Sequence, residues 1–334
     1  KEHLWLDRFT IKNLELVYPQ HERAKTLLDV IDYTLTAMGG RLLKRWVLLP
    51  LTDLKQIHAR NQAVSWFYSS PSSTQAIREL LSNCGDLERL ISKVAVGKVN
   101  PREIRHIHRS LELIGPIKQI LSEGKDNTMI CELSNSFQAC GELLNQIDTT
   151  IDPTPAIAVG KGDVIKAGVN QELDELRNIS NNGKQYLQEL QDREAEKTGI
   201  TSLKIAFNNV FGYYIEVRNT HKDKVPSEWI RRQTLVNAER YITEELKEYE
   251  EKILGAEAKI LAIEQRLYQE LLAALAIHVG VIQQNASTLA RLDVLSSFAV
   301  LAKEQQYCLP EVNDSLVIHI EEGRHPVIEK QLKS

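Results

Sequence analysis

Apolar residues recur at spacings of three and four along most of this chain, which is the pattern of amphipathic helices. Between residues 26 and 67 they predict two packed helices, with Pro50 between them and Asp53 opening the second. Three further helices are expected, over residues 73–92, 101–121 and 131–147. The first 150 residues or so therefore predict a helical body.

Residues 151–169 break this pattern with prolines and glycines, and predict a loop with one or two short strands. A long helix is expected over residues 169–197, ending near Gly199. A second long helix carries the three-four alternation of a coiled coil at Leu246, Tyr249, Ile253, Ala256, Ile260, Ile263 and Leu267. Because only a compact segment joins the two, we expect them to pack antiparallel. Separate packing of each helix on the body is the alternative.

The segment between the long helices alternates as a strand does. Leu203, Ile205 and Phe207 share one face, and the alternation resumes at Tyr213. A hairpin is predicted, with its turn at Asn208, Asn209 and Gly212, residue types that tolerate positive φ. The expected fold is mainly α: a helical core domain whose long antiparallel helices carry a small inserted antiparallel β domain.

Composition agrees with a helical protein. Only 16 Gly and 10 Pro occur among 334 residues, and residues that lose little rotamer freedom in a helix are prominent. The four cysteines (Cys84, Cys131, Cys140, Cys308) show no C-x-x-C spacing, so neither a disulfide framework nor a zinc site is expected.

The net charge of −4 for the chain reverses locally, because residues 201–240 contain seven Lys or Arg and four acids, a balance of 7 − 4 = +3. Amide, hydroxyl and guanidinium groups mixed in this way suit contacts with a nucleic-acid phosphate backbone. The candidate DNA-backbone-binding residues are Asn208, Asn209, Arg231, Arg232, Gln233, Thr234 and Asn237. A merely solvated surface has a similar composition and is the alternative.

Catalytic chemistry finds no support in the sequence. No segment fits the Gly-x-x-x-x-Gly-Lys-Ser/Thr loop that cradles nucleotide phosphates, and no nucleophile motif occurs. His106 and His108 lie two apart on a predicted helix and face different directions, which disfavours a metal site. The acids between Glu244 and Glu251 are expected on an exposed helix face, paired with Lys247 and Lys252. No catalytic, cofactor or metal residue is therefore predicted.

No apolar run reaches the roughly 20 residues that a membrane-spanning helix needs. The opening residues lack the apolar stretch and cleavage site of a signal peptide. A cytoplasmic protein is therefore expected, without a membrane partner.

Several long segments resemble the MutS family of DNA mismatch-repair ATPases. They are LDRFTIKNLEL from Leu6, LDVIDYTLTAMGGRLLKRWVLLPL from Leu28, AGVNQELDELR from Ala167, FNNVFGYYIEV from Phe207, RRQTLVNAERYITEELKEYE from Arg231 and IEEGRHPVIE from Ile320. The resemblance covers nearly the whole chain and keeps the family's order. It implies a helical core, or lever, domain over residues 1–188 and 244–312, an inserted β clamp domain over 189–243, and the start of an ATPase domain over 313–334.

The resemblance also implies roles for single residues. Asn208 and Asn237 match clamp positions that face DNA in the family, and Asn209, Arg232, Gln233 and Thr234 are extensions from their neighbourhood. The chain begins after the place of the family's mismatch-reading domain and stops before its phosphate loop. The resemblance therefore implies ATP and Mg²⁺, a homodimer and downstream repair proteins for a full-length parent located with the bacterial nucleoid, and none of these for this segment alone.

The hypothesis that follows is a DNA-clamping and lever section of a mismatch-repair protein. It contacts the backbone of double-stranded DNA without reading its bases and couples these contacts to an ATPase domain. The alternative is a scaffold of paired helices whose tip domain mediates protein dimerisation and does not bind DNA.

Overall fold

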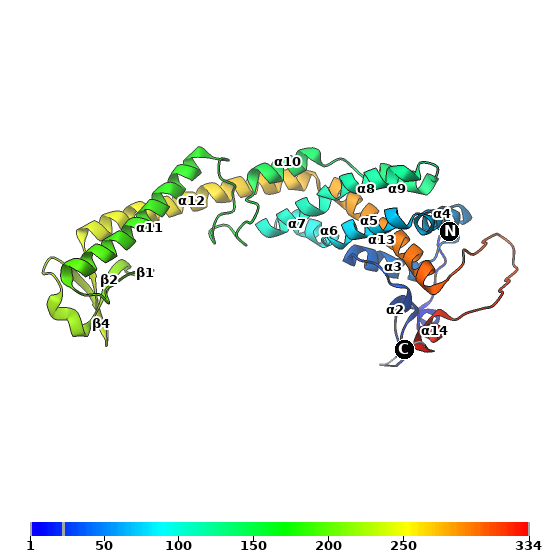
Figure 1. Cartoon of the computed structure of the whole chain (residues 1–334), viewed down its shortest axis with the longest axis horizontal. Coiled ribbons are helices and arrows are strands. Elements are labelled where there is room, and N and C mark those ends of the chain that lie inside the picture. Colours follow the sequence, from blue (N-terminus) through cyan, green and yellow to red (C-terminus); the bar gives the residue numbers. More distant parts are fainter. Residues whose placement is uncertain (1, 22–23, 333–334) are drawn as a thin grey trace. The chain divides into compact units, whose positions relative to one another are not determined.

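The computed structural model describes residues 2–21 and 24–332, and the chain divides into two compact units (Figure 1). The first unit comprises Lys1–Asp148 and Leu272–Ser334, and the second comprises Thr149–Leu271. The chain is mainly helical, and a four-stranded antiparallel sheet is inserted between two long helices. The predicted fold class is therefore confirmed. The second unit is larger than residues 189–243, and whether that stretch alone behaves as a domain stays a prediction.

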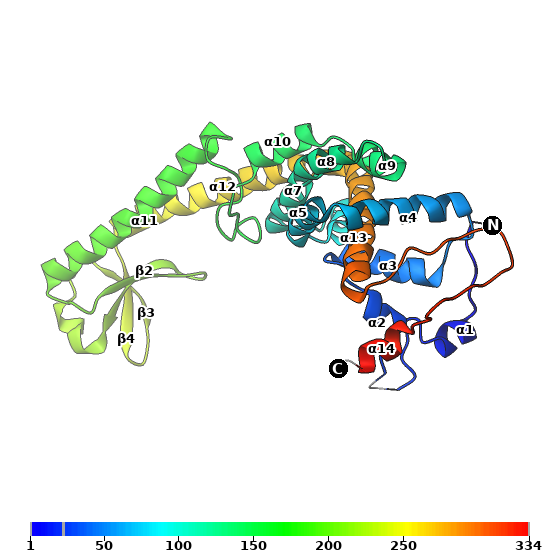
Figure 2. The ribbon, with the colours of Figure 1, turned by 45° about the vertical axis from the view of Figure 1, so that its right-hand side comes forward.

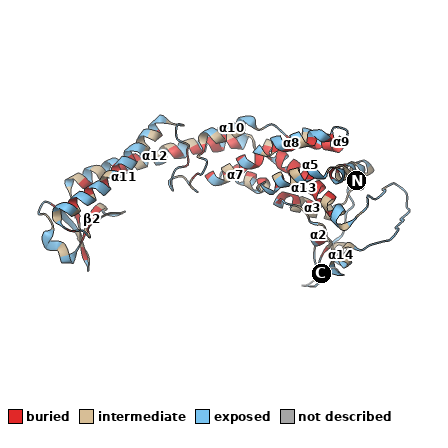
Figure 3. Ribbon diagram, in the orientation of Figure 1, coloured by how far each residue is buried: buried red, intermediate tan, exposed pale blue. Residues whose placement is uncertain are grey.

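In the first unit, short helices surround one long helix, α13 (Figure 2). The helices that begin in this unit or lie within it are α1 (Arg8–Asn13), α2 (Leu27–Ile31), α3 (Ala37–Leu48), α4 (Leu54–Ser69), α5 (Pro71–Ser82), α6 (Leu87–Ala95), α7 (Pro101–Glu112), α8 (Ile114–Leu121), the short 3₁₀ helix η1 (Ser122–Gly124), α9 (Thr128–Ser136), α10 (Gly141–Thr150), α13 (Val279–Gln305) and α14 (Pro326–Leu332). Helix α13 contacts α3, α4, α5, α6 and α9, and Figure 3 shows buried residues concentrated along these helices. The core of this unit is therefore built around α13.

Three predicted helices are each interrupted in the structure. Residues 73–92 form α5 and α6, residues 101–121 form α7 and α8, and residues 131–147 lie in α9 and α10. Asp86 starts α6 as its N-cap, accepting from the backbone N–H of Arg89. Pro116 has no N–H to continue the bonds of α7 into α8. The third break is held from outside, because Asn285 of α13 both accepts from Gln138 N (2.8 Å) and donates to Gln138 O (3.1 Å).

A buried carboxylate fixes the start of α3. Asp293 of α13 is fully buried and accepts hydrogen bonds from Leu35 N (3.0 Å), Thr36 N (2.8 Å) and Thr36 Oγ1 (2.7 Å). A Cβ at Gly39 would lie 2.2 Å from Oδ2 of Asp293, so only glycine fits there. The residues that enter α3 are thus held by a side chain more than 250 positions away, while Thr36 Oγ1 caps the helix by accepting from Gly39 N (2.9 Å).

In the second unit, α11 (Gln171–Thr198) and α12 (Glu244–Ile277) run antiparallel, as predicted. Ion pairs join them in reversed order: Arg177–Glu264, Lys184–Glu257 and Arg193–Glu245, each at 2.7 Å. Tyr186 and Tyr249 stack with ring centroids 3.8 Å apart. The helices approach closely at Gly183, where a Cβ would lie 2.5 Å from Ile253.

Two acids of α12 have different roles from those predicted. Glu250 accepts a hydrogen bond from the backbone N–H of Tyr213 (2.6 Å), and Glu245 accepts from the Tyr186 hydroxyl as well as from Arg193. The expected pairing with lysine holds for Glu248 and Lys252 (2.8 Å). The prediction of an exposed, solvating role is therefore wrong for Glu245 and Glu250, because Glu245 bonds to α11 and Glu250 bonds to the backbone of β2.

The loop before α11 is tied down by a buried ion pair. Ile151 and Ile165 form one antiparallel bridge, which confirms a short strand pair in this segment. Glu264 is 1% exposed and accepts from the backbone N–H groups of Val164 and Ile165 and from Arg177. The three-four spacing does not predict that Glu264 is buried, because Glu264 is charged and lies next to a predicted coiled-coil position rather than at one.

Candidate nucleic-acid interface

The sheet consists of two hairpins in the order β1-β2-β4-β3, with β1 (Lys204–Asn208), β2 (Gly212–Arg218), β3 (Ile230–Thr234) and β4 (Ala238–Ile242). One face packs on α11 and the start of α12 through a core that includes Leu187, Ile215 and Leu246. The short 3₁₀ helix η2 (Asn219–Lys224) follows β2 and contacts β2 and β4. Helix packing thus holds the sheet, while the hairpin turns remain available to solvent.

The first turn contains the predicted residues, but its asparagines do not adopt positive φ. Asn208 pairs with Gly212 across the hairpin, and Gly212 has φ of +75°. Asn208 and Asn209 do not have positive φ; instead, Oδ1 of Asn208 accepts from Val210 N at 2.8 Å. The glycine therefore supplies the left-handed conformation and Asn208 closes the turn with its side chain.

The second turn joins β3 and β4 at Val236 and Asn237, with Leu235 N donating to Ala238 O (2.8 Å). Val236 is 92% exposed. The register between β3 and β4 shifts between Arg231 and Gln233, so Arg232 is the extra residue of a β-bulge. A bulge on an edge strand redirects its side chain, and Arg232 is exposed.

The two turns lie at opposite ends of the sheet. Strands β2 and β4 pair antiparallel, with Arg218 opposite Ala238 and Ile215 opposite Tyr241. The first turn precedes β2 and the second precedes β4, so a strand length of about 20 Å separates them. The predicted residues therefore form two groups, Asn208 and Asn209 at one end, and Arg231, Arg232, Gln233, Thr234 and Asn237 on β3 and the other turn.

Three of the predicted residues are used inside the fold. Asn208 closes its turn, Gln233 accepts from Arg240 Nη1 (2.9 Å), and Arg231 Nη1 pairs with Glu239 (3.3 Å). A hydrogen bond from Tyr241, with further help from Arg231, lowers the pKa of Glu239. Burial, together with that bond, raises the pKa of Tyr241 to about 12. Arg231 is therefore engaged by Glu239, although its side chain remains mostly exposed.

The other four, Asn209, Arg232, Thr234 and Asn237, are exposed, and within residues 2–21 and 24–332 no side-chain hydrogen bond or ion pair engages them. Three residues that the sequence reasoning omitted lie beside the second turn. Asn219 donates to Val236 O (3.0 Å), and Arg218 and Lys222 are exposed nearby on β2 and η2. The local charge count included both cations, but only the structure shows that Arg218 pairs with Ala238 beside the turn and that Lys222 on η2 is near enough to Glu239 to help lower its pKa.

The arrangement offers hydrogen-bond donors and positive charge to an anion. Amide, hydroxyl and guanidinium groups of this kind contact phosphate oxygens without distinguishing base sequence. In the part of the chain that the structure describes, no group of His, Cys, Asp and Glu could hold a metal ion. His108 is buried and pairs with Glu112 (3.2 Å), and the four cysteines are free thiols.

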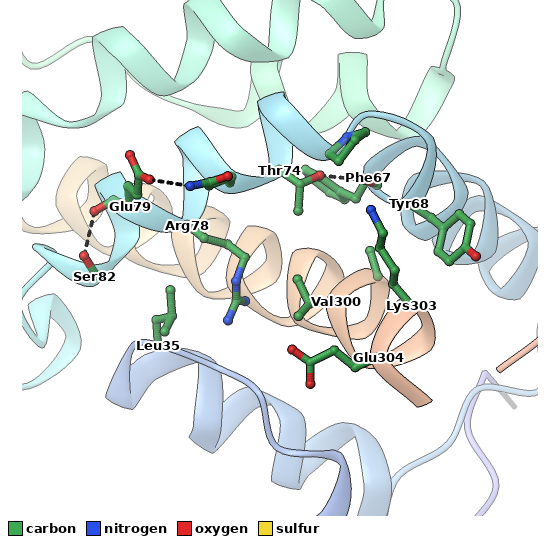
Figure 4. Close-up of a pocket in the computed structure, with 13 residues that line it drawn as sticks. Leu35, Phe67, Tyr68, Thr74, Arg78, Glu79, Ser82, Val300, Lys303 and Glu304 are labelled. Carbon is green, nitrogen blue, oxygen red and sulfur yellow. Dashed lines mark hydrogen bonds between the residues drawn. The ribbon is translucent and has the colours of Figure 1, made fainter. Parts of the chain in front are cut away.

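A hollow of about 530 Å³ in the first unit contains none of the predicted residues (Figure 4). Its lining includes Leu35, Arg78, Lys303 and Glu304. Arg78 Nη2 donates to Tyr33 O (2.8 Å), while its Nη1 is covered by protein and has no partner. Because Nη1 has no access to the hollow, this arginine does not make a ligand site there.

No helix among the described residues is long and apolar enough to cross a bilayer.

Comparison with known proteins identifies the family. Residues 9–299 match the family model of MutS domain III. The chain is 54% identical to the DNA mismatch repair protein MutS of Flavobacterium johnsoniae over 330 residues, 99% of this chain and 38% of that protein. It is 54% identical to the MutS of Parabacteroides distasonis over 328 residues (98% and 38%) and 50% identical to that of Porphyromonas gingivalis over 327 residues (98% and 37%). The chain thus spans little more than a third of the length of these relatives.

Proposed function

The chain belongs to the MutS family, and we propose that it forms a section of a mismatch-repair protein that grips duplex DNA through its phosphate backbone. The observation that carries the proposal is the set of exposed donors on the β3–β4 hairpin that the fold does not use. Arg232 protrudes from a bulge, and Thr234 and Asn237 lie on the same hairpin. The cations Arg218 and Lys222 add positive charge beside that turn.

The two hairpins of the sheet act as separate contact groups. The two turns are separated by about 20 Å, which is about the width of a duplex. One phosphate therefore cannot contact both turns. Strand β3 and the second turn carry the guanidinium and ammonium groups, with Arg232 at the middle of the sheet edge and Arg218 beside the turn, and therefore supply most of the salt-dependent affinity. Asn209 at the first end supplies a neutral contact.

The lever role is the second part of the proposal. Helix α12 is continuous from Glu244 beside the sheet to Ile277 in the first unit, and a helix transmits displacement along its axis better than a loop does. In a protein of the length of its relatives, we propose that this helix couples DNA contact to an ATPase domain. ATP with Mg²⁺, homodimerisation, downstream repair partners and a cytoplasmic location belong to that longer protein in this proposal.

The test measures binding of the chain to labelled duplex DNA by fluorescence anisotropy between about 50 and about 200 mM salt. We expect weak, sequence-indifferent binding that falls steeply with salt. Arg232→Ala should lower the affinity several-fold and reduce the salt slope by about 1, because it removes one phosphate contact. Arg231→Ala should have a smaller effect, since Glu239 already holds that guanidinium.

Arg109→Ala is the matched control, because Arg109 is an exposed arginine on α7 in the first unit. Equal effects of Arg109→Ala and Arg232→Ala would contradict the assignment. Dimerisation that depends on concentration, without DNA affinity at low salt, would favour the scaffold alternative. Comparing Asn209→Ala with Asn237→Ala shows whether both ends contact the duplex.

A further inference from the structure

A second hollow in the first unit, of about 520 Å³, lies among α3, α4, α9 and α13. Three arginines line it, Arg45 from α3, Arg60 from α4 and Arg291 from α13. Its size falls within the range of small-molecule sites. None of the residues proposed to bind DNA contributes to it.

The guanidinium of Arg60 lies over an aromatic ring. Its guanidinium carbon lies 3.5 Å from the centroid of the Trp46 ring. Burial, followed by repulsion from Arg291, lowers the pKa of Arg60 to about 10. This cation–π contact holds the guanidinium in place, and within the described residues no hydrogen bond or ion pair engages its N–H groups.

Arg291 is also partly buried, and burial lowers its pKa. Its one hydrogen-bond contact within the described residues goes to the Met129 sulfur, 3.8 Å from Nη2, and a thioether is a weak acceptor. Neither Arg60 nor Arg291 forms an ion pair with a carboxylate in the described part of the chain. Arg177, which is also largely buried, does pair with a carboxylate, that of Glu264.

The carboxylates of the hollow do not balance these charges. Glu88 lines it but is occupied by Arg41, whose Nη2 lies 2.6 Å from Oε2. Glu132 attracts Arg291 through space without a hydrogen bond to it. Placing two like charges in partial burial without a bonded counter-charge costs free energy, which a bound anion would recover.

We propose that this hollow is an anion site that takes a phosphate group, with Arg60 and Arg291 donating to its oxygens and Arg45 adding charge at the rim. The planar N–H fork of arginine matches two oxygens of one phosphate, and a pair of such forks converging from two helices matches a tetrahedral oxyanion. Inorganic phosphate and the phosphate of a free nucleotide share this chemistry.

The test titrates inorganic phosphate, pyrophosphate and adenosine monophosphate into the chain by calorimetry, with potassium chloride holding the ionic strength constant. We expect saturable binding of one anion per chain. Arg291→Ala and Arg60→Ala should each weaken it about tenfold or more, because each removes charge-assisted hydrogen bonds. Tighter binding of adenosine monophosphate than of inorganic phosphate assigns the site to a nucleotide, and the reverse order assigns it to the free anion.

Two further variants keep the proposal open to refutation even if an alanine variant unfolds. Arg291→Lys retains the charge without the fork and should bind with intermediate affinity. Glu132→Gln removes the nearest uncommitted carboxylate and should strengthen binding. Arg109→Ala again serves as the control. Absence of saturable binding would overturn the proposal. A Glu132→Gln variant that destabilises the chain without strengthening binding would also overturn it, and would assign Glu132 as the partner of Arg291.

Discussion

Helices α12 and α13 follow one another with only His278 between them, yet they stabilise the molecule in different ways. Helix α12 buries one stripe, which includes Leu246, Ile253 and Ala256, and leaves its other faces exposed over most of its length. Helix α13 is buried on every face over residues 292–297. One helix is therefore held along a line by its partner, and the other is enclosed by five neighbours.

This difference in burial explains why the spacing of apolar residues reveals the buried face of α12 but not that of α13. A helix with solvent on one side must alternate apolar and polar residues, so the coiled-coil spacing of α12 can be recognised in the sequence. A helix enclosed on all sides needs no such alternation, and α13 buries Asn285, Thr288, Asp293, Ser296 and Ser297 as well as leucines. Each of these polar side chains has a hydrogen-bond partner, which makes its burial tolerable.

The largest expected effect comes from a leucine exchanged in each helix. Leu295→Ala in α13 should lower the free energy of unfolding by about 2–5 kcal/mol, because it opens a cavity at a fully buried site. Leu254→Ala in α12, where the leucine is 36% exposed, should cost less than about 1 kcal/mol. Urea unfolding followed by circular dichroism measures both. Equal losses would mean that α12 is as enclosed as α13.

Alanine variants of two glycines test how closely α11 and α12 approach each other. Gly183→Ala on α11 should destabilise by about 1–3 kcal/mol, because the new methyl group meets Ile253 at 2.5 Å. Gly255→Ala on α12 meets nothing within 4 Å and should instead stabilise by up to about 1 kcal/mol through helix propensity. Thermal unfolding of the two variants gives the signs. Stabilisation by both would show that α11 and α12 do not approach at Gly183. A smaller cost of Gly183→Ala in an Ile253→Ala background, which lacks the Cγ1 atom at 2.5 Å, would support the contact.

The smallest expected effect is an opposite pH dependence of one acid from each helix. Burial raises the pKa of Asp293 above its ordinary 3.8, so the stability it contributes is present at low pH and decreases as pH rises through the folded-state pKa. The hydrogen bonds from Tyr186 and Arg193 lower the pKa of Glu245 below 4.5, so its contribution is present at neutral pH and is lost as pH falls through the lowered value.

Free energies of unfolding for the parent chain, Asp293→Asn and Glu245→Gln, measured from about pH 3 to about pH 7, test these signs. The gap between parent and Asp293→Asn should narrow as pH rises. The gap between parent and Glu245→Gln should widen, by less than about 1 kcal/mol because that ion pair is partly exposed. Parallel curves for the two variants would remove the distinction between the helices.

At the candidate site, the sequence indicated more about residue types than about their arrangement. Alternation at Leu203, Ile205 and Phe207 predicted the first hairpin, and Gly212 was placed correctly at its turn. The local charge pointed to the second hairpin. The engagement of Arg231 by Glu239 and the freedom of Arg232 followed from a bulge, which no periodicity reveals.

Residue spacing is enough to predict the mainly helical class, the antiparallel long helices and the inserted sheet, because it specifies which face of a half-exposed element turns away from water. The burial of Asp293 and Glu264, and the placement of the two hairpin turns at opposite ends of the sheet, depend instead on how distant segments pack together. A polar side chain is buried where partners for its hydrogen bonds converge, and those partners come from residues far apart along the chain.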